Sequence, residues 1–152
     1  MYTMGAVCFI VVALVVSCYG HKTDSGSCTP KLGTNQRDET FSAFAASLTA
    51  PKTLGTGEIV KFDKVWTNVN NDYDSSTGVY TAPKPGVYQF LCTVMTHYNK
   101  TLRVLLWKND MKTVAVYPGS SGHNTGTINM ILELKKGDKV YIKQTHREIH
   151  LQ

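Results

Sequence analysis

Two histidines near the carboxyl terminus have the type and spacing that most resemble a chemical site, in the run His146-Arg147-Glu148-Ile149-His150. Zinc metalloproteases bind the ion with paired histidines and activate water with a glutamate. That glutamate must directly follow the first histidine, on a helix, and a third ligand is needed. Here Glu148 is midway between the histidines, at the end of the chain. The run therefore predicts no metal site.

An acidic stretch at residues 72–78 resembles the start of a calcium-binding loop. An EF-hand requires glycine at the sixth position and glutamate at the twelfth, between two helices. Thr77 and Pro83 stand at those positions, so a turn explains the stretch better. The chain also contains no Gly-X-Ser-X-Gly elbow and no phosphate-binding glycine loop. We therefore expect no catalytic residues and no enzyme.

A modification site is predicted at Asn99. The triplet Asn99-Lys100-Thr101 is an N-glycosylation sequon, and it falls in a loop between two expected strands. In a secreted chain such a loop is accessible to the glycosylation machinery. Secretion is itself predicted by the first residues of the sequence.

The amino-terminal segment has the features of a secretory signal peptide. Residues 5–16 are all apolar or small, and no Lys, Arg, Asp or Glu occurs before Lys22. Twelve residues of helix span roughly 18 Å, which is less than the ~30 Å hydrocarbon core of a membrane. We predict that residues 1–20 are cleaved after Gly20. No later stretch is long and apolar enough to span a membrane, so the protein is expected to be secreted and extracellular.

Two of the four cysteines lie before the predicted cleavage site and two lie after it. Cys8 and Cys18 belong to the predicted signal peptide, which leaves Cys28 and Cys92. Cys92 lies inside a strand pattern and is expected to act as a small buried apolar residue. Cys28 lies in the polar residues 21–40, which we interpret as a flexible tail, and it is a candidate for an interchain disulfide. A Cys28–Cys92 bridge within one chain is the alternative.

Composition and charge narrow the class of partner. The 152 residues carry a net charge of +5, with 42% hydrophobic and 18% charged residues, as in an ordinary globular protein. The basic residues near the end are interspersed with acidic ones and do not form the dense stripe of a nucleic-acid interface. A mildly basic surface can attract anionic glycans, but charge alone favours the interpretation as an ordinary solvated face.

From residue 41 onward the sequence alternates short β-runs with turn residues. Val, Ile, Thr and Tyr are frequent in the runs, and the turns contain Gly, Pro, Asn and Asp. In the run 125–134, apolar side chains occupy every second position from Ile128 to Leu134. These features predict an all-β domain over residues 41–152, a sandwich or jelly roll. The expected strands are residues 41–48, 59–66, 79–81, 86–97, 102–108, 113–117, 125–134 and 139–144.

A spaced set of residues between positions 62 and 92 is more specific. The set is Phe62, Asn68, Tyr73, Tyr80, Gly86, Tyr88, Phe90 and Cys92. Together with Leu106-Trp107-Lys108-Asn109 and Lys136-Gly137-Asp138, it resembles the signature of the complement C1q globular-head family. The resemblance extends from about residue 41 to residue 144. We interpret the signature residues as structural, because alternate aromatic residues in a strand fill the space between two sheets.

The resemblance implies a tumour-necrosis-factor-like jelly roll of two antiparallel sheets that assembles as a homotrimer. Tyr80 departs from the usual phenylalanine and adds a hydroxyl that needs a partner. The resemblance also implies a final apolar strand after residue 144, and we expect this strand to be missing here. Some members bind calcium, but no motif here names its ligands, and we expect no cofactor.

Family resemblance further implies recognition of microbial polysaccharide or lipopolysaccharide in innate defence. The alternatives are an extracellular matrix protein or receptor ligand with the same fold, or a truncated paralogue. Trp66 and Trp107 could stack on sugars, although a role in the core or at a subunit interface is the simpler interpretation.

Overall fold

The computed structural model describes residues 2–4, 11–13, 41–119 and 121–145. Strands dominate these ranges, and the one helical element in them is a short 3-10 turn. The elements are β1 Tyr2–Met4, β2 Val11–Ala13, β3 Phe44–Ser47, β4 Lys52–Leu54, β5 Lys64–Asn68, η1 Val69–Asn71, β6 Tyr73–Asp74, β7 Val79–Thr81, β8 Gly86–Met95, β9 Val104–Lys108, β10 Met111–Val116, β11 Thr125–Leu134 and β12 Lys139–Gln144. No helix in the described ranges could span a membrane.

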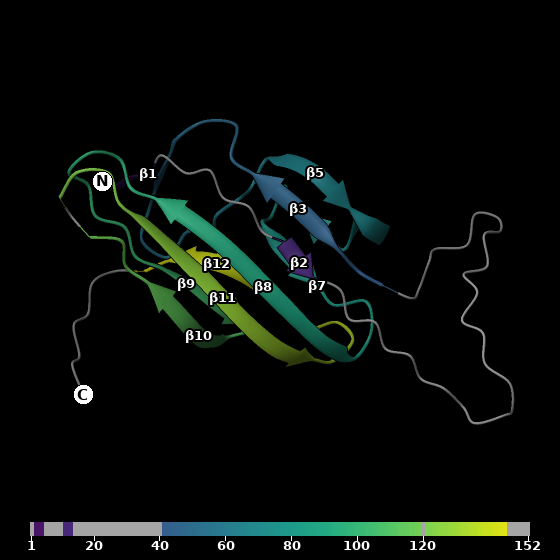
Figure 1. Cartoon of the computed structure of the whole chain (residues 1–152). Coiled ribbons are helices and arrows are strands. Elements are labelled where there is room, and N and C mark those ends of the chain that lie inside the picture. Colours follow the sequence, from purple (N-terminus) through teal and green to yellow (C-terminus); the bar gives the residue numbers. More distant parts are fainter. Residues whose placement is uncertain (1, 5–10, 14–40, 120, 146–152) are drawn as a thin grey trace, which may run out of the picture.

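The strands form two facing layers, and every pairing is antiparallel. One layer is a five-stranded sheet in the order β10-β9-β12-β7-β6. The other contains the three-stranded sheet β11-β8-β2 and the pair β3-β5. Figure 1 shows the long strands β8 and β11 in front of β9, β10 and β12. The predicted all-β jelly roll is confirmed.

The apolar alternation in β8 and β11 fixes their register and their buried face. These strands pair without a break from Gly86↔Leu134 to Met95↔Thr125. In β11, Ile128 and Leu134 are each 1% exposed, whereas Ile131 on the other face is 61% exposed. A shift of one residue would exchange these faces, so burial of the apolar residues specifies a single register.

Several expected strand boundaries were wrong. The expected strand at residues 59–66 is instead an extended segment followed by β5, and Ile59 makes only an isolated bridge to Lys143. Val60 and Phe62 are nevertheless buried. Their apolar alternation therefore reflects packing in the core and not pairing with a neighbouring strand. The short strands β4 and β6 were not expected, because three-residue and two-residue strands have too few positions to show alternation.

The amino-terminal strands fall inside the predicted signal peptide. Along the β8 edge opposite β11, β2 pairs Val12 with Phe90, and β1 pairs with β4. A chain cleaved after Gly20 would lack both strands, and that edge of β8 would lose its neighbour. The boundaries 1–20, 21–40 and 41–152 remain predictions. The expected absence of a final strand concerns residues beyond 145, which lie outside the described ranges.

Candidate functional site

Signature aromatic residues meet in one layer between the sheets. The Phe44 ring from β3 stacks on Tyr73 of β6 at 4.6 Å and on Tyr80 of β7 at 5.3 Å between ring centroids. The edge of Phe90 from β8 meets Tyr80 at 5.6 Å. Tyr88 is 6.0 Å from Tyr80, and all five rings are at most 3% exposed. The structure therefore places these signature residues in the core.

The Tyr80 hydroxyl begins a chain of hydrogen bonds that leads out of this layer. It lies 2.8 Å from Ser42 Oγ, which in turn donates to Asp72 Oδ2 at 2.5 Å. Burial raises the pKa of Tyr80, so the hydroxyl keeps its proton. The partner required by this tyrosine is thus supplied by a serine 38 residues earlier in the chain.

Asn68 closes the loop that follows β5. Its Nδ2 donates to Tyr73 O at 2.7 Å, and its Oδ1 accepts from Tyr73 N at 3.1 Å. The enclosed loop contains two residues with left-handed backbone, Asn70 and Asn71, each with φ of 59°. Asparagine tolerates this conformation better than most residues. The two hydrogen bonds between Asn68 and Tyr73 therefore hold the side chains of Asn70, Asn71 and Asp72 beside the aromatic layer.

A groove of about 680 Å³ opens at this loop. We call it the polar groove. It is lined by Phe41 before β3, the loop after β5, strands β6 and β7, the turn after β7 and the β11–β12 turn. Its lining residues are Phe41, Asn70, Asn71, Asp72, Asp74, Val79, Thr81, Ala82, Pro83, Lys84, Lys136 and Gly137. The groove could not be recognised from the sequence, because its residue types are also those of ordinary turns.

Polar groups in the groove are available to a ligand. The side chains of Asn71 and Lys136 are exposed and have no hydrogen-bond partner within the described part of the chain. Asp74 Oδ1 accepts from Ser76 N and Oγ, at 2.8 and 2.7 Å, and these bonds lower the pKa of the carboxyl group. Asp74 is therefore ionised at neutral pH. The groove combines amide, carboxylate and ammonium groups.

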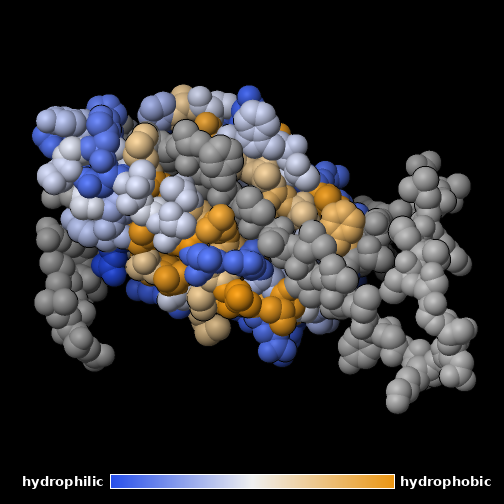
Figure 2. All heavy atoms as spheres, in the orientation of Figure 1, coloured by the Kyte–Doolittle hydropathy of each residue, from blue (hydrophilic) through white to orange (hydrophobic). Residues whose placement is uncertain are grey.

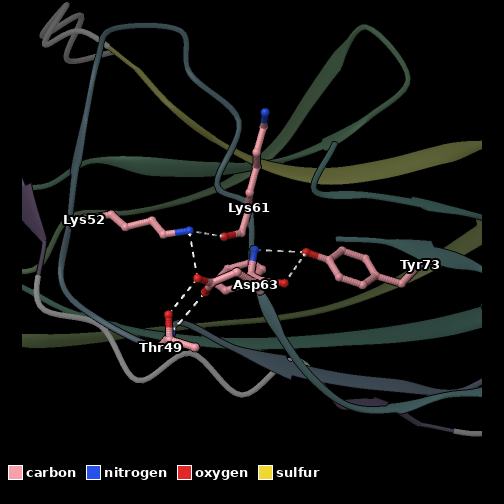
Figure 3. A network of polar contacts seen from close by, with 6 residues as sticks. Thr49, Lys52, Lys61, Asp63 and Tyr73 are labelled. Atoms are coloured by element: carbon pink, nitrogen blue, oxygen red, sulfur yellow. Dashed lines mark hydrogen bonds and ion pairs between the residues drawn. The ribbon is translucent and has the colours of Figure 1, made fainter. Parts of the chain in front are cut away.

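A separate polar network pins the segment before β5, as Figure 3 shows. Asp63 accepts from Thr49 N at 3.0 Å and from Thr49 Oγ1 at 2.7 Å, and Lys52 Nζ lies 3.4 Å from its Oδ2. The hydrogen bonds from Thr49 lower the pKa of Asp63 to about 2. Beside it, Tyr73 Oη accepts from Phe62 N at 3.0 Å and donates to Phe62 O at 3.2 Å. Burial raises the pKa of Tyr73 to about 12, so this network stays fixed at neutral pH.

Cys92 differs from its expected role. It is 1% exposed, as a strand position facing the core should be. It is, however, disulfide-bonded, and Cys92 is the only cysteine in the described ranges. The expectation of a simple apolar residue was therefore wrong, because strand periodicity is the same for a thiol and for a half-cystine. Cys28 lies outside the described ranges, so the interchain bond stays a prediction.

The remaining predicted residues are dispersed. Gly86 begins β8. Asn99 is exposed in the β8–β9 loop with φ of 53°. Trp66 of β5 is 58% exposed, whereas Trp107 of β9 stacks on Tyr141 at 6.2 Å, so the two indoles belong to different sheets. The histidine run at residues 146–150 lies outside the described ranges.

Comparison with known proteins assigns this fold to a family. Residues 43–152 match the family model of the C1q domain, well over half of the chain. The chain belongs to the C1q family. The globular domain of zebrafish complement 1qA superposes with a TM-score of 0.54 at 18% identity, over 97% of this chain and 86% of that chain. That likeness concerns the fold alone.

Three relatives show the range of the family. The heavy metal-binding protein HIP of Mytilus edulis is 34% identical over 103 residues, 66% of this chain and 48% of that protein. Two proteins of Homo sapiens, complement C1q and tumor necrosis factor-related proteins 9A and 9B, are 34% and 33% identical over 111 residues. In both, the match covers 70% of this chain and 32% of the relative. The chain therefore spans less than half the length of these relatives.

Proposed function

We propose that this C1q-family protein is secreted and recognises microbial polysaccharide or lipopolysaccharide in innate defence. The observation that carries the proposal is the polar groove. Glycans present closely spaced hydroxyl groups, which amide and carboxylate side chains bind with directed hydrogen bonds. Asn71 and Asp74 offer such groups in the groove.

Two lysines extend this preference toward anionic glycans. Lys84 and Lys136 also line the groove, and an ammonium group binds phosphate or carboxylate as a point charge. The net charge of +5 favours approach of the same ligands. The family's members are generally non-enzymatic binding proteins, so we infer recognition rather than catalysis at the groove.

The proposed assembly is a homotrimer. Proteins of the C1q family commonly form trimers. Support comes from the outward face of β8 and β11, where Val87 is 49% exposed and Ile131 is 61% exposed. Figure 2 shows apolar residues gathered on this face among polar ones. Light scattering of the secreted protein should give three times the mass of one chain, and a monomer would contradict the assembly.

The proposal is tested by saturation binding of the secreted protein to lipopolysaccharide and peptidoglycan at physiological salt. The groove variant combines Asn71→Gly, which keeps the left-handed backbone accessible, with Lys136→Ala. The matched control is Lys61→Ala, which removes one exposed lysine outside the groove. We expect saturable binding by the wild type, an affinity at least about tenfold lower for the groove variant, and little change for the control. Each lost charged hydrogen bond contributes roughly 1.5–3 kcal/mol.

Failure of saturable binding by the wild type would overturn the proposal. A matrix protein or a receptor ligand of the same fold would then be the better account. Expression separates these, since immune cells favour defence and matrix-secreting epithelium favours a structural role. Equal loss of binding in the groove variant and the control would instead indicate unspecific charge attraction.

A second candidate function is transition-metal binding. One relative is named a heavy metal-binding protein. In this chain the observation that favours it is a contact between two imidazole rings, of His97 and His123, whose centroids are 5.7 Å apart. Both side chains are exposed at the same end of the β8–β11 pair.

A further inference from the structure

Two loops bring His97 and His123 together at the end of the longest strand pair. His97 follows β8, and His123 precedes β11. The loops are joined by hydrogen bonds, with Thr96 N donating to Asn124 O at 2.8 Å and Asn124 N donating to Thr96 Oγ1 at 3.1 Å. The histidines, 26 positions apart in the sequence, are thus held against each other by a rigid frame.

Hydrogen bonds between Asn99 and Gly122 also join the two loops. Asn99 N donates to Gly122 O at 3.0 Å, and Gly122 N donates to Asn99 Oδ1 at 2.8 Å. Tyr98 packs its ring 5.6 Å from His123. The His123 imidazole therefore has one side fixed by the protein, and both histidine side chains are open to solvent.

The hydrogen bonding of His123 determines which of its nitrogens is free. Its Nδ1 lies 3.3 Å from Thr96 O. A carbonyl oxygen can only accept, so this contact requires the proton on Nδ1. Nε2 of the neutral ring then carries the lone pair. A backbone carbonyl on one imidazole nitrogen is the usual arrangement behind a histidine that binds metal through the other.

The separation of the rings suits a shared ion. Zinc lies about 2.0–2.1 Å from a histidine nitrogen, and two imidazoles at a tetrahedral angle then have centroids roughly 5 Å apart. The observed distance is 5.7 Å, with an interplanar angle of 67°. Because the His97 side chain is exposed, its ring can turn about χ2 to direct a nitrogen at an ion held by Nε2 of His123.

We propose that His97 and His123 bind one divalent transition-metal ion, with solvent completing its coordination. Imidazole nitrogen suits Cu²⁺, Ni²⁺ and Zn²⁺, and the order of affinities places Cu²⁺ first. The described residues hold no cluster of three or more histidine, cysteine or acidic side chains, so two protein ligands define this site. The proposal deepens the second candidate function and rests on it. It is independent of glycan binding at the polar groove.

The test is titration of the intact secreted protein with Cu²⁺, followed by calorimetry and electron paramagnetic resonance. The site variant is His97→Gln with His123→Gln, which leaves the Asn99 sequon intact. The matched control replaces the other three histidines of the sequence, as His21→Gln with His146→Gln and His150→Gln. The control matters because cleavage after Gly20 would place His21 at the amino terminus, where amine and imidazole also bind copper.

We expect the control, which lacks His21, to bind one Cu²⁺ per chain with nitrogen hyperfine structure from two imidazoles. The site variant should lose at least about tenfold in affinity together with this nitrogen signature, whereas the control should keep both. Ca²⁺, which prefers oxygen ligands, should not compete. If the site variant binds Cu²⁺ as well as the wild type while the control loses binding, the His97–His123 site is overturned but metal binding stands as a function. If none of the three proteins binds Cu²⁺, both the site and the metal-binding function are overturned.

Discussion

At the scale of single residues, one hydroxyl joins the aromatic core to the polar groove. Ser42 Oγ lies between the Tyr80 hydroxyl and the Asp72 carboxylate. Replacing Ser42 by alanine leaves a buried hydroxyl without its partner, whereas Tyr80→Phe removes the hydroxyl itself. We predict that Ser42→Ala costs about 1–3 kcal/mol and Tyr80→Phe less, and that the double variant is no worse than Ser42→Ala. Urea unfolding measures all three, and additive losses would contradict this coupling.

A carboxylate directly before β5 makes stability depend on pH. The pKa of Asp63 is lowered to about 2 in the folded protein, chiefly by hydrogen bonds from Thr49, against about 3.9 in an unfolded chain. Because the folded pKa is the lower one, the contribution is present above about pH 4 and is lost as the pH falls toward 2. The side chain is 37% exposed, so we expect less than about 1 kcal/mol. The difference between wild type and Asp63→Asn should therefore shrink between pH 4 and 2, and a constant difference would contradict the assignment.

Glycosylation is also decided at one residue. Asn99 is exposed in a turn, and its Oδ1 accepts from Gly122 N while Nδ2, the atom that carries a glycan, points to no partner in the described ranges. We predict that the secreted wild type loses mass on enzymatic removal of N-glycans and that Asn99→Gln is unaffected by the treatment. Mass spectrometry of the two proteins makes the comparison. A wild type of unmodified mass would show that the sequon is unused.

At the scale of elements, the turn before β7 depends on a glycine. A Cβ on Gly78 would lie 2.5 Å from Val60 O, and its φ is 78°. Gly137 has a similar φ of 87° with nothing within 4 Å of an added Cβ. Both alanine variants should lose about 1 kcal/mol for the left-handed backbone, and Gly78→Ala should lose more because backbone must move. Thermal unfolding compares them, and equal losses would show that the close approach relaxes freely.

The elements also show how far the sequence predicts this structure. The expected strands at residues 125–134 and 139–144 match β11 and β12 residue for residue, because alternating burial leaves a period-two pattern. The short strand β7 also matches the expected residues 79–81, because turn residues bound it on both sides. The polar groove left no such pattern, since its lining residues come from four separate segments of the chain. No sequence pattern indicates the contact of His97 with His123 either. It depends on the β8–β11 register, which places residues 26 apart on neighbouring loops.

At the scale of the whole molecule, the core and the ligand surfaces occupy different places. The aromatic residues and Cys92 of the spaced C1q signature are buried between the sheets, whereas the proposed groove and the histidine pair lie largely on turns and loops. Loops carried on a rigid scaffold commonly provide binding residues. The family signature can therefore be kept while the ligand changes, and recognition has to be tested at the groove itself.

Hydrogen–deuterium exchange of the secreted protein, with and without oligosaccharide prepared from lipopolysaccharide, tests this account most directly. The account predicts slower exchange in peptides covering residues 69–74, 81–84 and 136–138, the walls of the polar groove. Peptides covering β5 and the exposed Trp66 should exchange at an unchanged rate. Protection centred on Trp66, or no protection at saturating oligosaccharide, would contradict the groove as the site of recognition.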